Sequence, residues 1–203
     1  MRVSWITLAA VSLLAITPAY AAPDSKSQII QTGKSPMEFD CPGRSQVRLN
    51  VRSGEIHVVG SDDAKISVAL SGRNKENIQD VKARLSCGES VAELHVSGGP
   101  KNELIITIRV PRTVNLYARV PAGQVNVEGI GGDKDVEMHA GELTINVGNT
   151  GDYGHVDASV SAGELDAEAF GQEKGGLFRS ISKEGKGSYH LHAHVGSGQL
   201  TLR

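Results

Sequence analysis

Apolar and polar residues alternate along most of this chain, and a short phrase that contains glycine interrupts the alternation five times. In each copy, the apolar residue before the glycine is followed five positions later by the apolar residue after it. The copies span residues 51–56, 120–125, 138–143, 160–165 and 195–200. Alternation on both sides of a glycine predicts strands that meet at tight corners, which is typical of repetitive β architectures.

The glycines of these phrases are predicted to be structural corners, because glycine adopts a positive φ without a Cβ clash. They are Gly54, Gly123, Gly141, Gly163 and Gly198. The last four lie 18, 22 and 35 residues apart. The two shorter steps fit single coils of a β-solenoid, and the longest fits one coil plus an insert, predicted as a loop over residues 170–188. We therefore expect an all-β, single-domain β-solenoid with five corner repeats and a less regular N-terminal part.

The first 21 residues are predicted to be a signal peptide. Arg2 precedes a short apolar run over residues 6–16, and Ala19-Tyr20-Ala21 fits the small-x-small cleavage rule. The run is shorter than the roughly 20 residues that a membrane-spanning helix needs, so no transmembrane segment is expected. We expect an exported chain, periplasmic or at the cell surface, with a flexible lead-in over residues 22–37 and one domain over residues 38–203.

The composition limits the kinds of partner that the protein can bind and indicates the redox state of its compartment. Removal of the signal peptide takes only Arg2 from the charged residues and leaves 20 basic and 23 acidic residues. This near balance lacks the excess of basic residues that nucleic-acid binding needs. Cys41 and Cys87 are the only cysteines. A lone pair in an exported chain predicts a disulfide, the alternative being two separate buried thiols.

The segment Leu104-x-x-x-Ile108-x-Val110-Pro111-Arg112 is followed by serial copies of x-Gly-[Glu/Gln]-apolar-x-apolar. This combination resembles the bacterial "putative adhesin" domain family over roughly residues 45–203. The resemblance implies a right-handed β-helix or a closely related β-solenoid in exported and cell-surface proteins. It supplies no catalytic residues to carry over.

The chain lacks the Gly-x-Ser-x-Gly, His-Glu-x-x-His and Gly-x-Gly-x-x-Gly motifs of common enzyme classes. Asp133, Lys134 and Asp135 are predicted to form a solvated turn. An acid or amide follows each corner glycine, and these side chains are predicted to stack in one hydrogen-bonded row rather than to form a catalytic pair. They are Glu55, Gln124, Glu142, Glu164 and Gln199. We therefore expect no enzymatic activity and no catalytic residue.

Histidines offer the one candidate ligand site. His190, His192 and His194 alternate with apolar residues and are predicted to share one outward strand face. Alignment by the corner glycines places them beside His155, Asp157 and Ser159 respectively. Imidazole and carboxylate ligands suit Zn, Ni or Cu, so the candidate metal ligands are His155, Asp157, His190 and His192. The alternative is a polar face without a cofactor. His57, His95 and His139 are interpreted as lone surface positions.

Three functions remain open. The first is a non-enzymatic, adhesin-like envelope or surface protein that binds an unknown protein or glycan, or has a structural role, through a repetitive β surface. The alternatives are a periplasmic transition-metal-binding module and a carbohydrate-active β-helix enzyme. Residues 200–203 end the chain within a predicted strand. We expect the 170–188 insert to cover that end through Leu177 and Phe178, which favours a monomer.

Overall fold

The computed structural model describes residues 27–72, 78–99 and 104–203, so the predicted signal peptide lies outside the described residues. The described chain is all-β and forms one mixed sheet. Eight shorter strands come first: β1 (Ser27–Thr32), β2 (Met37–Phe39), β3 (Gln46–Val51), β4 (Gly54–Ser61), β5 (Ile66–Gly72), β6 (Lys82–Cys87), β7 (Val91–Ser97) and β8 (Leu104–Pro111).

Five longer strands follow: β9 (Asn115–Glu128), β10 (Lys134–Ile145), β11 (Tyr153–Ala167), β12 (Gln172–Glu184) and β13 (Tyr189–Leu202). Two short 3₁₀ turns, η2 (Thr150–Asp152) and η3 (Glu168–Phe170), flank β11. Within the described residues we find no helix that is long and apolar enough to cross a membrane.

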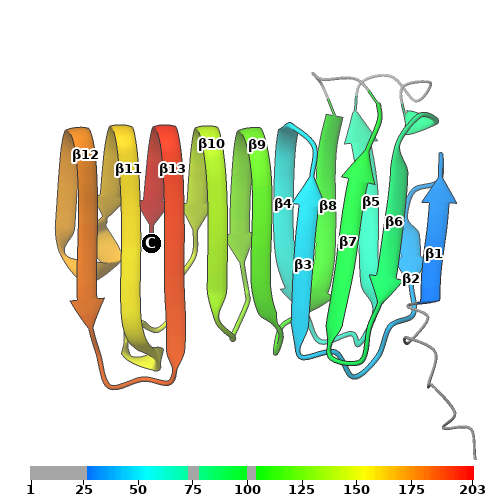
Figure 1. The fold of residues 1–203 in the computed structure, drawn as a ribbon, viewed down its shortest axis with the longest axis horizontal. Helices are drawn as coiled ribbons and strands as arrows, with labels where there is room; N and C mark the ends of the chain where they lie inside the picture. Colours follow the sequence, from blue (N-terminus) through cyan, green and yellow to red (C-terminus); the bar gives the residue numbers. More distant parts are fainter. Residues whose placement is uncertain (1–26, 73–77, 100–103) are drawn as a thin grey trace, which may run out of the picture.

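Each long strand bends and contributes to two layers (Figure 1). The first part of β9 pairs with β3, and its second part, from Gly123 onward, pairs with β4. The front layer therefore holds β1, β6, β7, β3 and the first halves of β9, β10, β13 and β11. The back layer holds β2, β5, β8, β4 and the second halves of β9, β10, β13 and β11. The corner glycines lie in register, since Gly54, Gly123, Gly141, Gly198 and Gly163 pair in that order. All five have a positive φ.

The core lies between the layers and consists of aliphatic columns. In one column Ala118, Val136, Ala193 and Ala158 stack in register, and Val125, Leu143, Leu200 and Leu165 form another. All eight side chains are buried. Alternation along each strand thus sends apolar side chains inward and polar side chains to the outer faces. Small aliphatic residues suit this narrow interior, because each side chain stacks on a similar side chain of the neighbouring strand.

The C-terminal strand does not lie at the end of the sheet. β13 pairs in parallel with β10 on one side and with β11 on the other. The order in space is therefore β9, β10, β13, β11, β12 (Figure 1). The prediction that the fold ends at residues 200–203 and is covered there by the 170–188 insert is wrong, because both edges of β13 are paired inside the sheet.

This order alternates the polar residues that follow the corners. In space they run Glu55, Gln124, Glu142, Gln199, Glu164. Chain order would have set Glu142 beside Glu164, and like charges on neighbouring strands are destabilising. Gln124 Nε2 donates to Glu142 Oε2 at 3.1 Å. The insertion of β13 therefore separates two glutamates with an amide.

Two segments are more ordered than predicted. Most of the 170–188 segment is not a loop but β12, which pairs antiparallel with β11. Its Leu177 and Phe178 are 65% and 82% exposed, so they do not cover the core. The lead-in predicted as flexible contains β1, which pairs antiparallel with β6, while residues 22–26 lie outside the described residues. Backbone pairing explains both differences. Each segment supplies an extended strand that pairs with the edge of its neighbour, β1 with β6 and β12 with β11.

The predicted disulfide is present. Cys41 follows β2 in the back layer, Cys87 ends β6 in the front layer, and their Cα atoms are 6.2 Å apart. The bond therefore ties the two layers together at the N-terminal end of the sheet.

Candidate functional site

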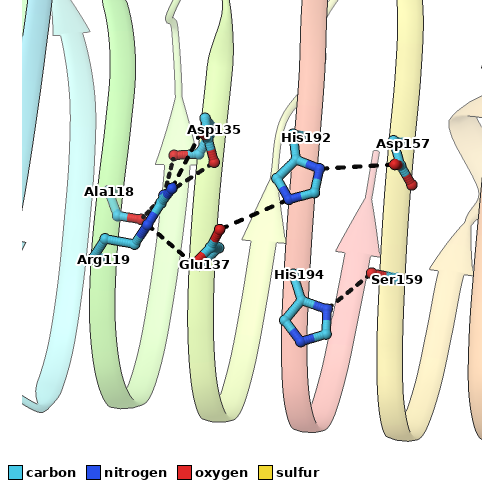
Figure 2. A network of polar contacts seen from close by, with 8 residues as sticks. All are labelled: Ala118, Arg119, Asp135, Glu137, Asp157, Ser159, His192 and His194. Carbon is cyan, nitrogen blue, oxygen red and sulfur yellow. Dashed lines mark hydrogen bonds and ion pairs between the residues drawn. The ribbon is translucent and has the colours of Figure 1, made fainter.

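The outer side of the front layer carries a network of charged and imidazole side chains over β9, β10, β13 and β11 (Figure 2). These residues alternate with buried ones, so each strand presents every second side chain to solvent. Arg119 Nη1 lies 3.0 Å from Asp135 Oδ1, and its Nε lies 3.1 Å from Glu137 Oε2. One guanidinium thus pairs with two carboxylates of the neighbouring strand.

β13 places its imidazoles beside this ion pair network. His192 lies between two carboxylates, with Nε2 4.0 Å from Glu137 Oε1 and Nδ1 4.0 Å from Asp157 Oδ2. His194 Nδ1 lies 2.9 Å from Ser159 Oγ. Figure 2 shows His192 joining β10 to β11 across β13. His192 therefore faces carboxylates of both neighbouring strands, and His194 contacts the hydroxyl of one of them.

A second cluster lies nearer the start of β13. His155 Nδ1 is 2.7 Å from Glu184 Oε1, and His190 Nδ1 is 3.6 Å from Asp133 Oδ1. The two imidazole ring centroids are 6.5 Å apart. His190 pairs with His155, His192 with Asp157 and His194 with Ser159, as the corner alignment predicted.

The candidate metal ligands are thus brought together as two neighbouring pairs. A further group, Asp135, Glu137 and His192, has ligand atoms that all lie within 4.8 Å of one another. Arg119 already contacts both of its carboxylates, so a cation occupies that position. Sequence reasoning missed this group because β10 was not expected to lie beside β13.

A hollow of about 290 Å³ opens on the same layer, beside the ends of β7 and β3 and the corners of β9 and β10. Valine and proline line it together with polar and charged residues, chiefly Asn50, Arg52, His95, Arg119, Glu137 and His139. Binding sites commonly combine an apolar lining with a few convergent polar groups. His95 and His139, interpreted from the sequence as lone surface positions, therefore belong to one concave surface.

Lys134 is the one charged residue among the buried described residues and is 2% exposed. It is the first residue of β10 and stacks between Leu116 and Leu191, so the predicted solvated turn is wrong at this position. Its Nζ donates to Tyr153 Oη at 2.6 Å and to the Gly132 carbonyl at 3.1 Å. Tyr153 Oη donates to the Val147 carbonyl at 3.0 Å. The amine is a structural anchor, since burial keeps it from any substrate.

Burial lowers the pKa of Lys134 to about 8, although Asp133 and Asp152 oppose the shift. Burial, together with Asp152 and Tyr189, raises the pKa of Tyr153 to about 12. Between pH 8 and 10.5 the unfolded chain binds a proton at Lys134 that the folded chain does not bind. The free energy of unfolding therefore rises with pH in that window, by up to about 1.4 kcal/mol per pH unit. Above pH 10 the tyrosine reverses the sign, because the unfolded chain loses its phenolic proton first.

We expect Lys134→Met to abolish the rise in stability between pH 8 and pH 10, because the titrating amine is gone. Lys65→Met is the control, since the Lys65 side chain is 57% exposed and pairs with Glu38 at the surface. Urea unfolding at closely spaced pH values measures both. A rise of the same slope in Lys134→Met and wild type would contradict the assignment.

The fold is similar to that of solved bacterial proteins. A "putative cell adhesion protein" from Clostridium sporogenes aligns with a TM-score of 0.56 at 12% identity, over 88% of this chain and 99% of its own. A "putative adhesin" from Bacteroides fragilis aligns with a TM-score of 0.35 at 10% identity, over 88% of this chain and 98% of its own. No family model and no curated protein matches the sequence. The predicted resemblance to adhesin-named proteins is confirmed for the fold.

Proposed function

We propose that the protein is an exported, non-enzymatic, adhesin-like protein of the cell envelope or surface, which binds a protein or glycan partner through the outer side of its front layer. The hollow beside the corners carries the proposal. It draws side chains from four neighbouring strands and sets two imidazoles, two guanidiniums and a carboxylate beside valine and proline side chains. Such a surface can hold a sugar ring or an extended peptide by stacking and hydrogen bonding.

Two observations support export and an adhesin-like role. The Cys41–Cys87 bond suits an oxidising compartment. The Clostridium sporogenes structure of the same fold is named for cell adhesion. We also propose that β3 with β4, β9, β10, β13 and β11 form a β-solenoid of five corner repeats, supported by the in-register glycine row. The antiparallel strands at both ends then act as flanking elements.

Binding of fluorescent mature chain to a glycan array, and to immobilised cell-surface proteins, tests the proposal. We expect saturable binding to one class, weakened at least tenfold by His95→Ala/His139→Ala. His57→Ala is the matched control, because His57 faces outward on the back layer beside Glu55. Absence of saturable binding, or equal losses in the front and back variants, would overturn it.

A second candidate is a transition-metal site on His155, Asp157, His190 and His192. The specific observation is that Glu184 and Asp133 face Nδ1 of His155 and His190 respectively. Metal-ligating histidines usually donate the other ring N–H to a carboxylate, which fixes the ring for coordination through Nε2. The donor set of imidazole and carboxylate fits Zn²⁺, Ni²⁺ or Cu²⁺.

Calorimetric titration of the mature chain with each of these three ions tests the metal site. We expect His155→Ala/His190→Ala to weaken binding at least tenfold, and Glu184→Gln to weaken it by a smaller factor through loss of ring orientation. His95→Ala/His139→Ala removes the same number of imidazoles elsewhere on the layer and should leave the affinity unchanged. If both double variants lose affinity equally, the ion binds histidines nonspecifically and the site is rejected.

A further inference from the structure

The sheet ends in an open edge at β12. Within the described chain β12 pairs with β11 alone, and it is the last strand of the sheet path. It spans 13 residues and bends, so its second half lies in the front layer and its first half in the back layer (Figure 1). A long open strand edge presents N–H and C=O groups to another strand, and proteins normally shorten or cover such edges.

The bend of β12 also exposes two large apolar side chains. Leu177 is 65% exposed and Phe178 is 82% exposed. Phe178 has a φ of 51°, the only positive φ of a non-glycine residue in the described chain. A bulky residue rarely holds this conformation in the absence of a structural or functional constraint. The bend therefore exposes an apolar pair on the last strand of the described sheet.

We infer that β12 is a dimer interface, where a second copy of this chain pairs its own β12 antiparallel to the first. The bend selects this partner. Only a strand bent at the same place can pair along both halves, and β12 itself supplies one. The other end of the sheet does not match, because β1 has six residues and β2 has three, on separate strands.

The molecule already contains an antiparallel pairing of this kind. β11 and β12 are both bent, run antiparallel, and set Gly163 opposite Gly176 at the corner. A two-fold axis near Leu177 would repeat this arrangement between copies. The axis sets Phe178 opposite Phe178 of the second copy, which also sets Arg179 opposite Leu177 and Glu184 opposite Gln172. These two charged residues then face uncharged ones, so like-charge repulsion does not oppose the pairing there.

The symmetry has a consequence for binding. Antiparallel pairing about the bend joins the front half of one β12 to the back half of the other. The front layers of the two copies then face opposite directions, and the dimer presents its two hollows on opposite sides. Loss of the dimer would leave each hollow intact, so this inference stands or falls independently of the proposed function.

Size-exclusion chromatography with light scattering, on the mature chain between 1 and 100 µM, tests the interface. We expect a mass of two chains that does not grow further with concentration. Leu177→Asp/Phe178→Asp should give a monomer with unchanged circular dichroism, because both side chains are exposed. Ile30→Asp is the matched control at the opposite edge, where Ile30 on β1 is 58% exposed.

Cross-linking gives a second readout that does not depend on affinity. Phe178→Cys should form a disulfide-linked dimer under mild oxidation, and Ile30→Cys should not, since the two native cysteines are already bonded to each other. A monomer at 100 µM, open-ended polymers, or a dimer disrupted by Ile30→Asp rather than by the β12 variant would each overturn the inference. Polymers would indicate head-to-tail stacking of the two sheet ends.

Discussion

Replacing Gly141 with alanine should lower the free energy of unfolding by about 3–5 kcal/mol. Gly141 has a φ of +125°, a conformation that side chains with a Cβ rarely adopt. A Cβ built there would also lie 2.0 Å from the Gly123 carbonyl oxygen on the neighbouring strand. Since that oxygen belongs to the backbone, the two strands would have to separate at the corner. Urea unfolding followed by circular dichroism measures the loss.

Two controls separate the clash from the other effects. Gly148 also has a positive φ, +68°, but a Cβ there meets nothing within 4 Å. Gly148→Ala should therefore cost only about 1–2 kcal/mol, the cost of the left-handed conformation. Thr144→Val changes an outward, half-buried position of the same strand as Gly141 and should be close to neutral. Equal losses for Gly141→Ala and Gly148→Ala would remove the argument from strand contact.

The corner phrases were sufficient to predict the bends, the inward and outward alternation and the register of His190 against His155. They could not fix the order of the strands, because chain order was taken as spatial order. The insertion of β13 between β10 and β11 joins residues that are distant in sequence, and no local propensity encodes it. One non-local signal was available. Placing Gln199 between Glu142 and Glu164 alternates charge along the row, whereas chain order sets two glutamates side by side.

The candidate sites were predicted only where a motif was visible in one strand. Three imidazoles on β13 stand out in the sequence, whereas the hollow draws His95 and His139 from strands with no motif of their own. Lys134 was missed for a different reason. Its charge and its acidic neighbours indicated a solvated turn, yet the alternation of Val136 and Met138 continues inward to Lys134. The tyrosine hydroxyl that makes its burial tolerable lies 19 residues away and belongs to another strand.

Removal of the disulfide should cost about 2–4 kcal/mol, because the bond spans 46 residues and restricts the unfolded chain. Cys41→Ser/Cys87→Ser should lose this amount in urea unfolding. A reducing agent should produce the same loss in the wild-type chain and none in the double variant, which separates loss of the bond from loss of the buried sulfur atoms. Thiol labelling of the unfolded, unreduced chain should detect no free cysteine. Two reactive thiols per chain would show that the protein does not carry the bond.

Because the bond ties β2 to β6 at the N-terminal end of the sheet, its removal should raise hydrogen exchange there first. The corner row from Gly123 to Gly163 should stay protected.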